Sequence, residues 1–345
     1  MRLRLVVVAA FLALTAVPAY FAYTTGVLPG PAQASAESST AAQGVAHRIG
    51  RLAWPAEPLG LTATDTTVLW EQRDPSPSVA GLWSYDVRTQ RTVRVLGRSA
   101  TGKSAGFPSA SGDVIAWSAW AGRRGAGQPQ IQAYDPASTR CWTVAPAGSH
   151  PTVAGESVIW VEPGGADGSD LIRGCNSLTD EKYSITADGR VRAIAARGTW
   201  AVWIAGRGKA GAVWAGSYAN ADRHKLAAAG TAVAIDRDRI LWAAPVGRHS
   251  TAVVSWDRRS SRSKVLCRVV GTVSSLALSR RYAAWVTTRE ATGSQVCVYD
   301  FGGGKVSTIS AGDSRQASPV IVAGSVYWAD DRSGQWELYA RSLRP

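Results

Sequence analysis

The chain has little of several residue types. Its 345 residues include one Met, four Phe, four Cys and four His, and only 18% of them carry a charge. Apolar residues make up 46% of the chain, which is a globular composition and excludes an intrinsically disordered protein. The composition also excludes collagen and coiled coil, and the lack of repeated long apolar runs excludes a multi-span membrane protein.

The one long apolar run lies at the N-terminus. Arg2 and Arg4 precede it, the run extends from Leu5 to Tyr23 without a charge, and Ala32-Gln33-Ala34 follows as a cleavage signal. This order predicts that residues 1–34 are a signal peptide or an uncleaved N-terminal anchor. Residues 35–45 are predicted to be a flexible tether. We therefore expect a protein that is secreted or extracytoplasmic, with contact to a membrane only through such an anchor.

Tryptophan, by contrast, is abundant, and seven of the 15 Trp residues mark a repeat. Each of the seven ends a short β-rich run, and their spacings are 47, 43, 43, 39, 43 and 43 residues. A tight polar turn stands before each run. The seven anchors are Trp70, Trp117, Trp160, Trp203, Trp242, Trp285 and Trp328.

Each unit contains four short β-rich runs and no helical periodicity. Four antiparallel strands in about 43 residues are typical of one blade of a β-propeller. The sequence thus predicts an all-β fold, a seven-bladed β-propeller over residues 46–345. The last unit has only three strands, so we expect His47–Ala53 to supply the fourth, next to the strand around Trp336–Leu343. The anchor tryptophans are predicted to fill the space between blades.

The last unit also carries a recognisable motif. Residues 330–339 read DDRSGQWELY, which resembles the D-x-R-x-G-x-x-x-[IL]-[YW] repeat of TolB-like, or WD40-like, β-propellers. The segment Tyr85-Asp86-Val87-Arg88-Thr89 resembles the Y-D-x-x-T turn of the same repeats. Units 3 and 4 lack the Tyr-Asp pair. The resemblance implies a non-catalytic, exported propeller that makes protein contacts in the cell envelope, and it implies no catalytic residue.

Two motifs in one Gly/Ser-rich connector imitate enzyme signatures. Residues 97–104 match the phosphate-loop pattern, and residues 102–106 match the nucleophile-elbow pattern. Both sites require a helix directly after the motif, but Pro108 and a Trp-anchored strand follow. We therefore expect no catalytic residue and no cofactor. Because metal-binding motifs such as H-E-x-x-H and C-x-x-C are also absent from the sequence, we expect no metal.

Three residues are candidates for a binding site at the mouth of the central channel. His150 precedes Pro151 at the start of a first strand, while Glu71 and Asp330 follow anchor tryptophans in units that are neighbours in a closed ring. Paired carboxylates leave open the alternative of a carbohydrate-active hydrolase or lyase. Three or more charged side chains within hydrogen-bond reach at the mouth would favour that enzyme, and a lining of Ala, Ser, Val and Thr would favour a binding module.

Basic residues outnumber acidic residues by 38 to 25, a net charge of +13. Three arginine-rich clusters lie at 123–124, 258–264 and 280–281. They are consistent with solvated loops, or with attraction to an envelope protein or an anionic cell-surface polymer. Because the basic residues are spread over several units of an exported chain, we expect no nucleic-acid binding. We also expect the protein to be a monomer.

The four cysteines fall at related positions of the repeat. Cys141 and Cys267 are predicted in fourth strands of units 2 and 5, and Cys175 and Cys297 in third strands of the units that follow. In an exported chain this arrangement predicts two inter-blade disulfides, Cys141–Cys175 and Cys267–Cys297. Four free thiols are the alternative.

Overall fold

A computed structural model describes residues 46–51, 60–73, 80–96, 103–121, 127–164, 168–208, 210–220, 222–289 and 293–343. The predicted leader, residues 1–34, and the predicted tether, residues 35–45, lie outside these ranges. Within them every regular element is a β-strand. None of the described residues forms a helix that could cross a membrane.

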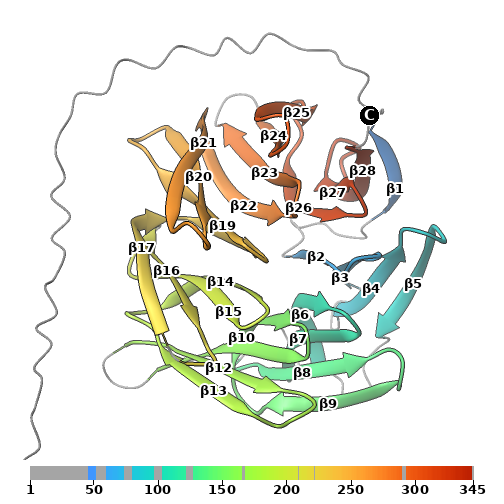
Figure 1. The fold of residues 1–345 in the computed structure, drawn as a ribbon. Coiled ribbons are helices and arrows are strands. Elements are labelled where there is room, and N and C mark those ends of the chain that lie inside the picture. Colours follow the sequence, from blue (N-terminus) through green and yellow to red (C-terminus); the bar gives the residue numbers. More distant parts are fainter. Residues whose placement is uncertain are drawn as a thin grey trace, which may run out of the picture. The chain divides into compact units, whose positions relative to one another are not determined.

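The strands group into seven four-stranded antiparallel sheets, which are the predicted blades (Figure 1). Blade 1 consists of β2 (Leu61–Ala63), β3 (Thr67–Arg73), β4 (Ala80–Asp86) and β5 (Arg91–Leu96). Blade 2 consists of β6 (Lys103–Ser111), β7 (Val114–Ala121), β8 (Gln130–Asp135) and β9 (Arg140–Ala145). Blade 3 consists of β10 (Ser149–Ala154), β11 (Ser157–Glu162), β12 (Leu171–Asn176) and β13 (Lys182–Thr186).

Blades 4 to 7 continue the same order. Blade 4 consists of β14 (Val191–Arg197), β15 (Trp200–Ala205), β16 (Gly211–Ser217) and β17 (Asp222–Gly230), and blade 5 of β18 (Ala232–Asp236), β19 (Arg239–Pro245), β20 (Ser250–Asp257) and β21 (Arg262–Val270). Blade 6 consists of β22 (Thr272–Leu278), β23 (Tyr282–Arg289), β24 (Gly293–Asp300) and β25 (Lys305–Ala311). Blade 7 consists of β26 (Gln316–Val322), β27 (Ser325–Asp330), β28 (Glu337–Ser342) and β1 (His47–Arg51).

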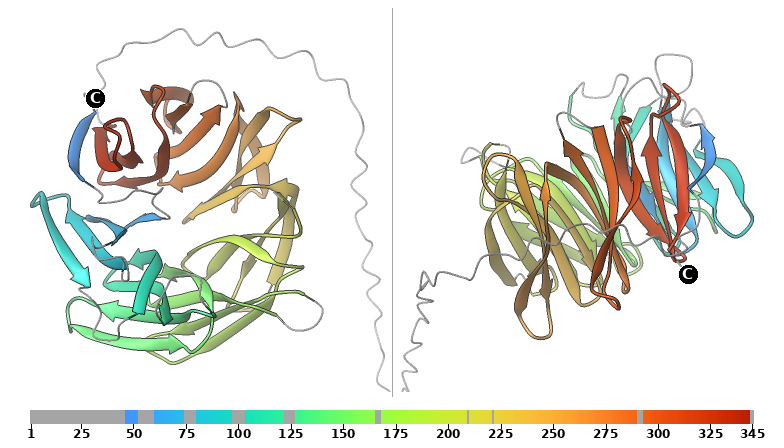
Figure 2. Two further views of the ribbon diagram at one scale, coloured as in Figure 1. Left: turned by 180° about the vertical axis from the view of Figure 1, so that it is seen from behind. Right: turned by 90° about the horizontal axis from the view of Figure 1, so that it is seen from above.

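The ring closes in blade 7, as the sequence predicts. The N-terminal strand β1 pairs antiparallel with β28, with His47 opposite Ala340 and Arg51 opposite Glu337. Figures 1 and 2 show β1 on the outer side of β28, while the first strand of each blade faces the centre of the ring. The two ends of the propeller thus share one sheet, which gives β28 a partner along its outer edge.

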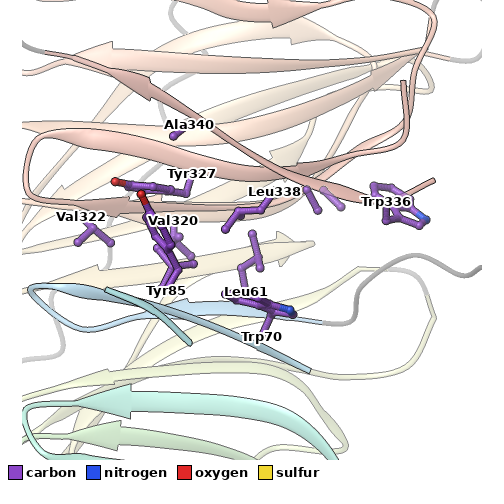
Figure 3. Packing of buried hydrophobic residues seen from close by; sticks show 12 residues of the cluster. Leu61, Trp70, Tyr85, Val320, Val322, Tyr327, Trp336, Leu338 and Ala340 are labelled. Carbon is purple, nitrogen blue, oxygen red and sulfur yellow. The ribbon is translucent and has the colours of Figure 1, made fainter. Parts of the chain in front are cut away.

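The seven anchor tryptophans lie on the second strands and fill the space between blades. All are buried, with 0–8% of their surface exposed. Each belongs to a separate apolar cluster formed by two adjacent blades. Figure 3 shows the cluster between blades 7 and 1, where Trp70 and Leu61 face Leu338. Burial of about 150–250 Å² per Trp makes these contacts a main source of stability.

The aspartate of the Y-D-x-x-T turn has a local structural role. The Oδ1 atom of Asp86 accepts hydrogen bonds from the backbone N–H groups of Arg88 (2.9 Å) and Thr89 (2.8 Å). In blade 3, which lacks the Tyr-Asp pair, the side-chain oxygen of Asn176 accepts the equivalent bonds from Leu178 and Thr179. The side-chain oxygen therefore fixes the turn between the third and fourth strands, so Asn can replace Asp.

Candidate functional site

A cavity of about 940 Å³ lies at the channel end where the first strand of each blade turns into the second. We call it the mouth. Residues of all seven blades line it, and a cavity of this size can hold several sugar rings or a short peptide. The lining residues used below are Thr64, Asp65, Ser109, Ser111, Gly112, Gly155, Arg197, Gly198, Trp200, Asp236, Arg237, Arg258 and Arg280.

The seven turns at the mouth are not equivalent. In blades 2, 3 and 4 the first turn residue is glycine: Gly112, Gly155 and Gly198, which we call the glycine side. Their φ angles are +56°, +62° and +59°, a left-handed conformation that glycine adopts without steric cost. A Cβ added at any of them would meet no atom within 4 Å, so each of these lining glycines has open space beside its backbone.

Blades 5 and 6 present arginines in place of these glycines. The exposed residues Arg237 and Arg280 lie in the turns after β18 and β22. Arg258, which directly follows β20, completes what we call the arginine side. Among the described residues, no carboxylate lies within 4 Å of any of these three guanidinium groups, although several other arginines of the propeller are paired.

Arg258 is the most firmly positioned of the three. Its guanidinium stacks 4.1 Å from the ring centroid of Trp200 in blade 4, and its Nη1 donates a hydrogen bond to the Arg237 carbonyl (2.6 Å). Its Nε is buried and has no acceptor among the described residues. Burial lowers the pKa of Arg258, and the negative charge of Asp238 partly opposes this by raising the pKa. A bound anion would relieve the cost of burying this cation.

The position of Arg258 is unusual within the repeat. The residue directly after the third strand is uncharged in the other six blades: Val87, Pro136, Ser177, Tyr218, Phe301 and Leu343. In most blades its backbone N–H donates a hydrogen bond to a carbonyl of the first turn, and Arg258 keeps that bond with Asp238. The backbone hydrogen bond at this position is thus common to most blades, but only blade 5 has a cationic side chain there.

The charges at the mouth are positive on balance. Four arginines and two aspartates line it, a surplus of two positive charges. Arg197 and Asp236 form an ion pair of 3.8 Å between blades 4 and 5. Of the charged lining residues that the structure describes, no other two form an ion pair, and the lining combines charged side chains with Ala, Ser, Val and Thr, so it has features of both predicted outcomes.

Hydroxyl groups line the other blades. Ser109 Oγ accepts a hydrogen bond from Val153 N–H (2.9 Å), and Ser111 Oγ accepts one from Gly155 N–H (3.2 Å). Thr64 Oγ1 similarly accepts a bond from Thr67 N–H. None of these three hydroxyls donates a hydrogen bond to another described residue, so their O–H groups are available to donate. The mouth therefore offers donors on both sides, from guanidinium groups on one and from hydroxyls on the other.

The structure places the three predicted channel residues away from the mouth. His150 lies in β10, a first strand as predicted, but at the opposite end of that strand from the Gly155 turn. Its φ is +50°, its Nδ1 lies 3.0 Å from Ser149 Oγ, and its ring lies 4.6 Å from the ring of Phe107. Glu71 is buried in β3, with 1% of its surface exposed. Ligand binding by these residues stays a prediction.

Asp330 is fully buried and is held by neighbours in its own blade. It accepts hydrogen bonds from Trp328 Nε1 (3.2 Å) and Gln316 Nε2 (3.1 Å), and it pairs with Arg332. Burial raises the pKa of this carboxyl, but the Arg332 side chain, the Arg332 N–H and Trp328 outweigh it and lower the pKa overall. The D-x-R part of the TolB-like motif thus forms a buried structural network. These partners of Asp330 all belong to blade 7, and Glu71 of blade 1 is not among them.

The cysteines occupy the predicted strands, but all four are free thiols, so neither predicted disulfide is present in the structure. Cys175 Sγ lies 3.4 Å from Asp180 Oδ1, toward the turn of its own blade, and Cys141 is exposed on β9. Cys267 and Cys297 share the cluster between blades 5 and 6. Burial, and then the proximity of Cys297, raise the pKa of Cys267 to about 12.

The two enzyme-like motifs do not have the local structure that their chemistry requires. Lys103 begins strand β6, which continues to Ser111, where a phosphate loop or a nucleophile elbow would begin a helix. Residues 97–102 lie outside the described ranges. Among the residues that the structure describes, no group of three or more His, Cys, Asp or Glu side chains could hold a metal ion.

Comparison with known proteins supports the fold alone. No protein-family model and no curated protein matches the chain. An oligogalacturonate lyase from Vibrio parahaemolyticus has a TM-score of 0.64 and 10% identity, over 87% of this chain and 93% of that one. TolB from Acinetobacter baumannii has a TM-score of 0.50 and 16% identity, over 72% and 65%. The acylaminoacyl peptidase of Pyrococcus horikoshii has a TM-score of 0.53 and 10% identity, over 69% and 44%.

The sequence analysis identified only part of the mouth. Arg258 and Arg280 belong to basic clusters, but nothing in the sequence alone distinguished Arg237 or Trp200. The usable signal was the alignment of the seven turns before the anchor tryptophans. It places Gly112, Gly155 and Gly198 of blades 2 to 4 at the same position as Arg237 and Arg280 of blades 5 and 6. Which turns face one cavity follows only from the closed ring.

Proposed function

We propose that the chain is an exported, non-catalytic binding module that holds an anionic ligand of the cell envelope at the mouth of its channel. The observation that carries the proposal is the arginine side, where Arg237, Arg258 and Arg280 have no carboxylate within 4 Å among the described residues. Arginine recognises carboxylate and phosphate groups through its planar set of N–H donors.

The position of the site supports the same proposal. The mouth is built from turns, and the strands below it form a rigid scaffold in which each blade is packed against the next by an anchor tryptophan. The structural neighbours include both enzymes and TolB, so they favour neither catalysis nor binding. The lining favours binding, because its carboxylates, Asp65 and Asp236, come from blades 1 and 5, and Asp236 is paired with Arg197.

A binding assay with a turnover assay tests the proposal. Residues 46–345 are titrated with polygalacturonate, polyphosphate and neutral dextran at about 20 mM and about 150 mM salt, and each mixture is then analysed for cleavage products. We expect the two polyanions to bind more weakly at the higher salt, dextran not to bind, and no product to form. Lack of binding to both polyanions would overturn the proposal, and cleavage of polygalacturonate would favour the lyase or hydrolase alternative.

Export is tested separately on the full chain. The mature protein is isolated from the producing cell and its N-terminus is sequenced. An N-terminus after residue 34, or an intact leader in the membrane fraction, is the expected result. An intact leader in the soluble cytoplasmic fraction would contradict export.

A further inference from the structure

We propose that the ligand of the mouth is an acidic oligosaccharide in which charged and neutral sugars are mixed, lying from the arginine side across to the glycine side. This inference rests on the proposed function and names the ligand class. It follows from the difference between the two halves of the mouth: at the same position of the repeat, one half has arginines and the other has glycines.

The arginine side explains the acidic part of the ligand. Arg258 is fixed by Trp200 and by the Arg237 carbonyl, so it presents its remaining N–H donors without first losing side-chain freedom. Arg237 and Arg280 are exposed turn residues on the same side. Together they can hold one or two carboxylates by paired N–H···O bonds.

The charge of the whole mouth limits how acidic the ligand can be. The surplus is only two positive charges, because Asp236 offsets Arg197 and Asp65 lies in the turn of blade 1. A densely charged polymer, such as polyphosphate, would bring phosphates close to Asp65 and over blades without a cation. We therefore infer a ligand with few charges for its length.

The other half of the mouth suits a neutral, hydroxyl-rich segment. Gly112, Gly155 and Gly198 leave the backbone of three successive turns open, so a flat ring can approach closely. Ser109 and Ser111 accept backbone N–H bonds and donate none to another described residue, so their O–H groups are free to donate. Sugar hydroxyls and ring oxygens are suitable acceptors, and this half contains no cation that would need an anion.

Three tetrasaccharides of equal length and different charge test the inference by calorimetry. The probes are maltotetraose with no carboxylate, a hyaluronan tetrasaccharide with two, and tetragalacturonate with four; tripolyphosphate is a fourth probe. We expect the hyaluronan tetrasaccharide to bind at least about tenfold more tightly than maltotetraose, and tetragalacturonate to gain no more than about twofold beyond it. A steady rise in affinity with charge, with tripolyphosphate the tightest, would overturn the inference.

Substitutions on the glycine side give a second readout. Asn tolerates the left-handed conformation, so Gly112→Asn and Gly155→Asn keep the turns while they fill the open space. We expect the double variant to bind the hyaluronan tetrasaccharide at least about fivefold more weakly and to bind glucuronate, a single sugar, unchanged. Gly247→Asn is the matched control, because Gly247 has a φ of +73°, equally open space and no place at the mouth.

The outcomes separate this inference from the proposed function. If polyanions bind through the arginine side but the glycine-side substitutions have no effect on the tetrasaccharide, the anionic binding function stands and the oligosaccharide inference is wrong. If no anionic probe binds, both are wrong.

Discussion

At the scale of single residues, two anchor tryptophans that are equally buried have different hydrogen-bonding roles. Trp328 and Trp285 both have 0% of their surface exposed. The indole N–H of Trp328 donates to the buried carboxylate of Asp330, whereas that of Trp285 has no acceptor among the described residues. Replacement by Phe removes the same volume at both positions, but only at Trp328 does it also remove a hydrogen bond between described residues.

We therefore predict that Trp328→Phe lowers the free energy of unfolding by about 1.5–3 kcal/mol more than Trp285→Phe does. The reason is that Asp330 loses a donor inside the protein, where no water replaces it. Urea unfolding followed by tryptophan fluorescence measures both variants. Equal losses would show that the bond to Asp330 contributes nothing to stability.

The free thiols differ in the environments that control their reactivity. Cys141 is exposed, and burial raises its pKa less than that of Cys267, which reaches about 12. A thiol reacts with iodoacetamide as the thiolate, and with a pKa of about 12 only about one molecule in ten thousand is ionised at pH 8.

We predict that Cys141 of the native protein is alkylated first at pH 8, and that Cys267 reacts more slowly by at least about a hundredfold. The rate at Cys267 should rise about tenfold per pH unit as long as the fold persists. Peptide mass spectrometry over a time course measures both sites. Equal rates, or recovery of Cys267 linked to Cys297 before any reductant is added, would contradict the free, partly buried thiol.

At the scale of secondary-structure elements, the closure of the ring depends on β1, a strand of five residues. Backbone pairing with β28 is supported by an ion pair between Arg48 Nε and Glu337 Oε1 at 3.2 Å, in which Glu337 is almost fully buried and also accepts a hydrogen bond from Tyr339. Because Glu337 cannot regain full hydration, the loss of the Arg48 guanidinium costs more than the loss of a surface ion pair.

We predict that Arg48→Ala lowers the free energy of unfolding by about 1–2 kcal/mol. Arg91→Ala, a change at an exposed arginine on the outer strand β5, is the control and should cost less than about 0.5 kcal/mol. Chemical unfolding of the two variants in parallel makes the comparison. Similar stabilities would mean that the Arg48–Glu337 ion pair contributes nothing to the closure of the ring.

At the scale of the whole molecule, the periodic features were predictable from the sequence and the asymmetric features were not. The anchor spacing gave the blade count, and the incomplete last unit gave the pairing of β1 with β28, because both depend on strand patterns that recur along the chain. Neither predicted disulfide is present, although each cysteine lies in its predicted strand: Cys175 Sγ lies near Asp180 of its own blade, and Cys267 and Cys297 share one cluster as free thiols.

The candidate site shows the same limit. Glu71 and Asp330 were predicted at the mouth because they follow anchor tryptophans, but these second-strand positions are buried, and Asp330 serves the packing of blade 7. The residues that do line the mouth, such as Arg237 and Gly155, sit in the turns at the other end of the second strand. Choosing between the two ends requires the relative placement of all seven blades, which no single unit contains.

The most direct test of the account compares two variants that lose the same charge at different places. The first is Arg237→Gln/Arg258→Gln/Arg280→Gln at the mouth, and the second is Arg91→Gln/Arg262→Gln/Arg268→Gln on the exposed outer strands β5 and β21. Thermal unfolding of both confirms that the fold is kept, and calorimetry measures their binding of polygalacturonate at about 50 mM salt.

If the mouth is the binding site, the first variant binds at least about tenfold more weakly than the unchanged protein, because each arginine supplies charge-assisted hydrogen bonds, and the second stays within about twofold of it. Equal losses in the two variants would show that polygalacturonate is attracted by the net charge of +13 and not by the mouth, and would contradict the account.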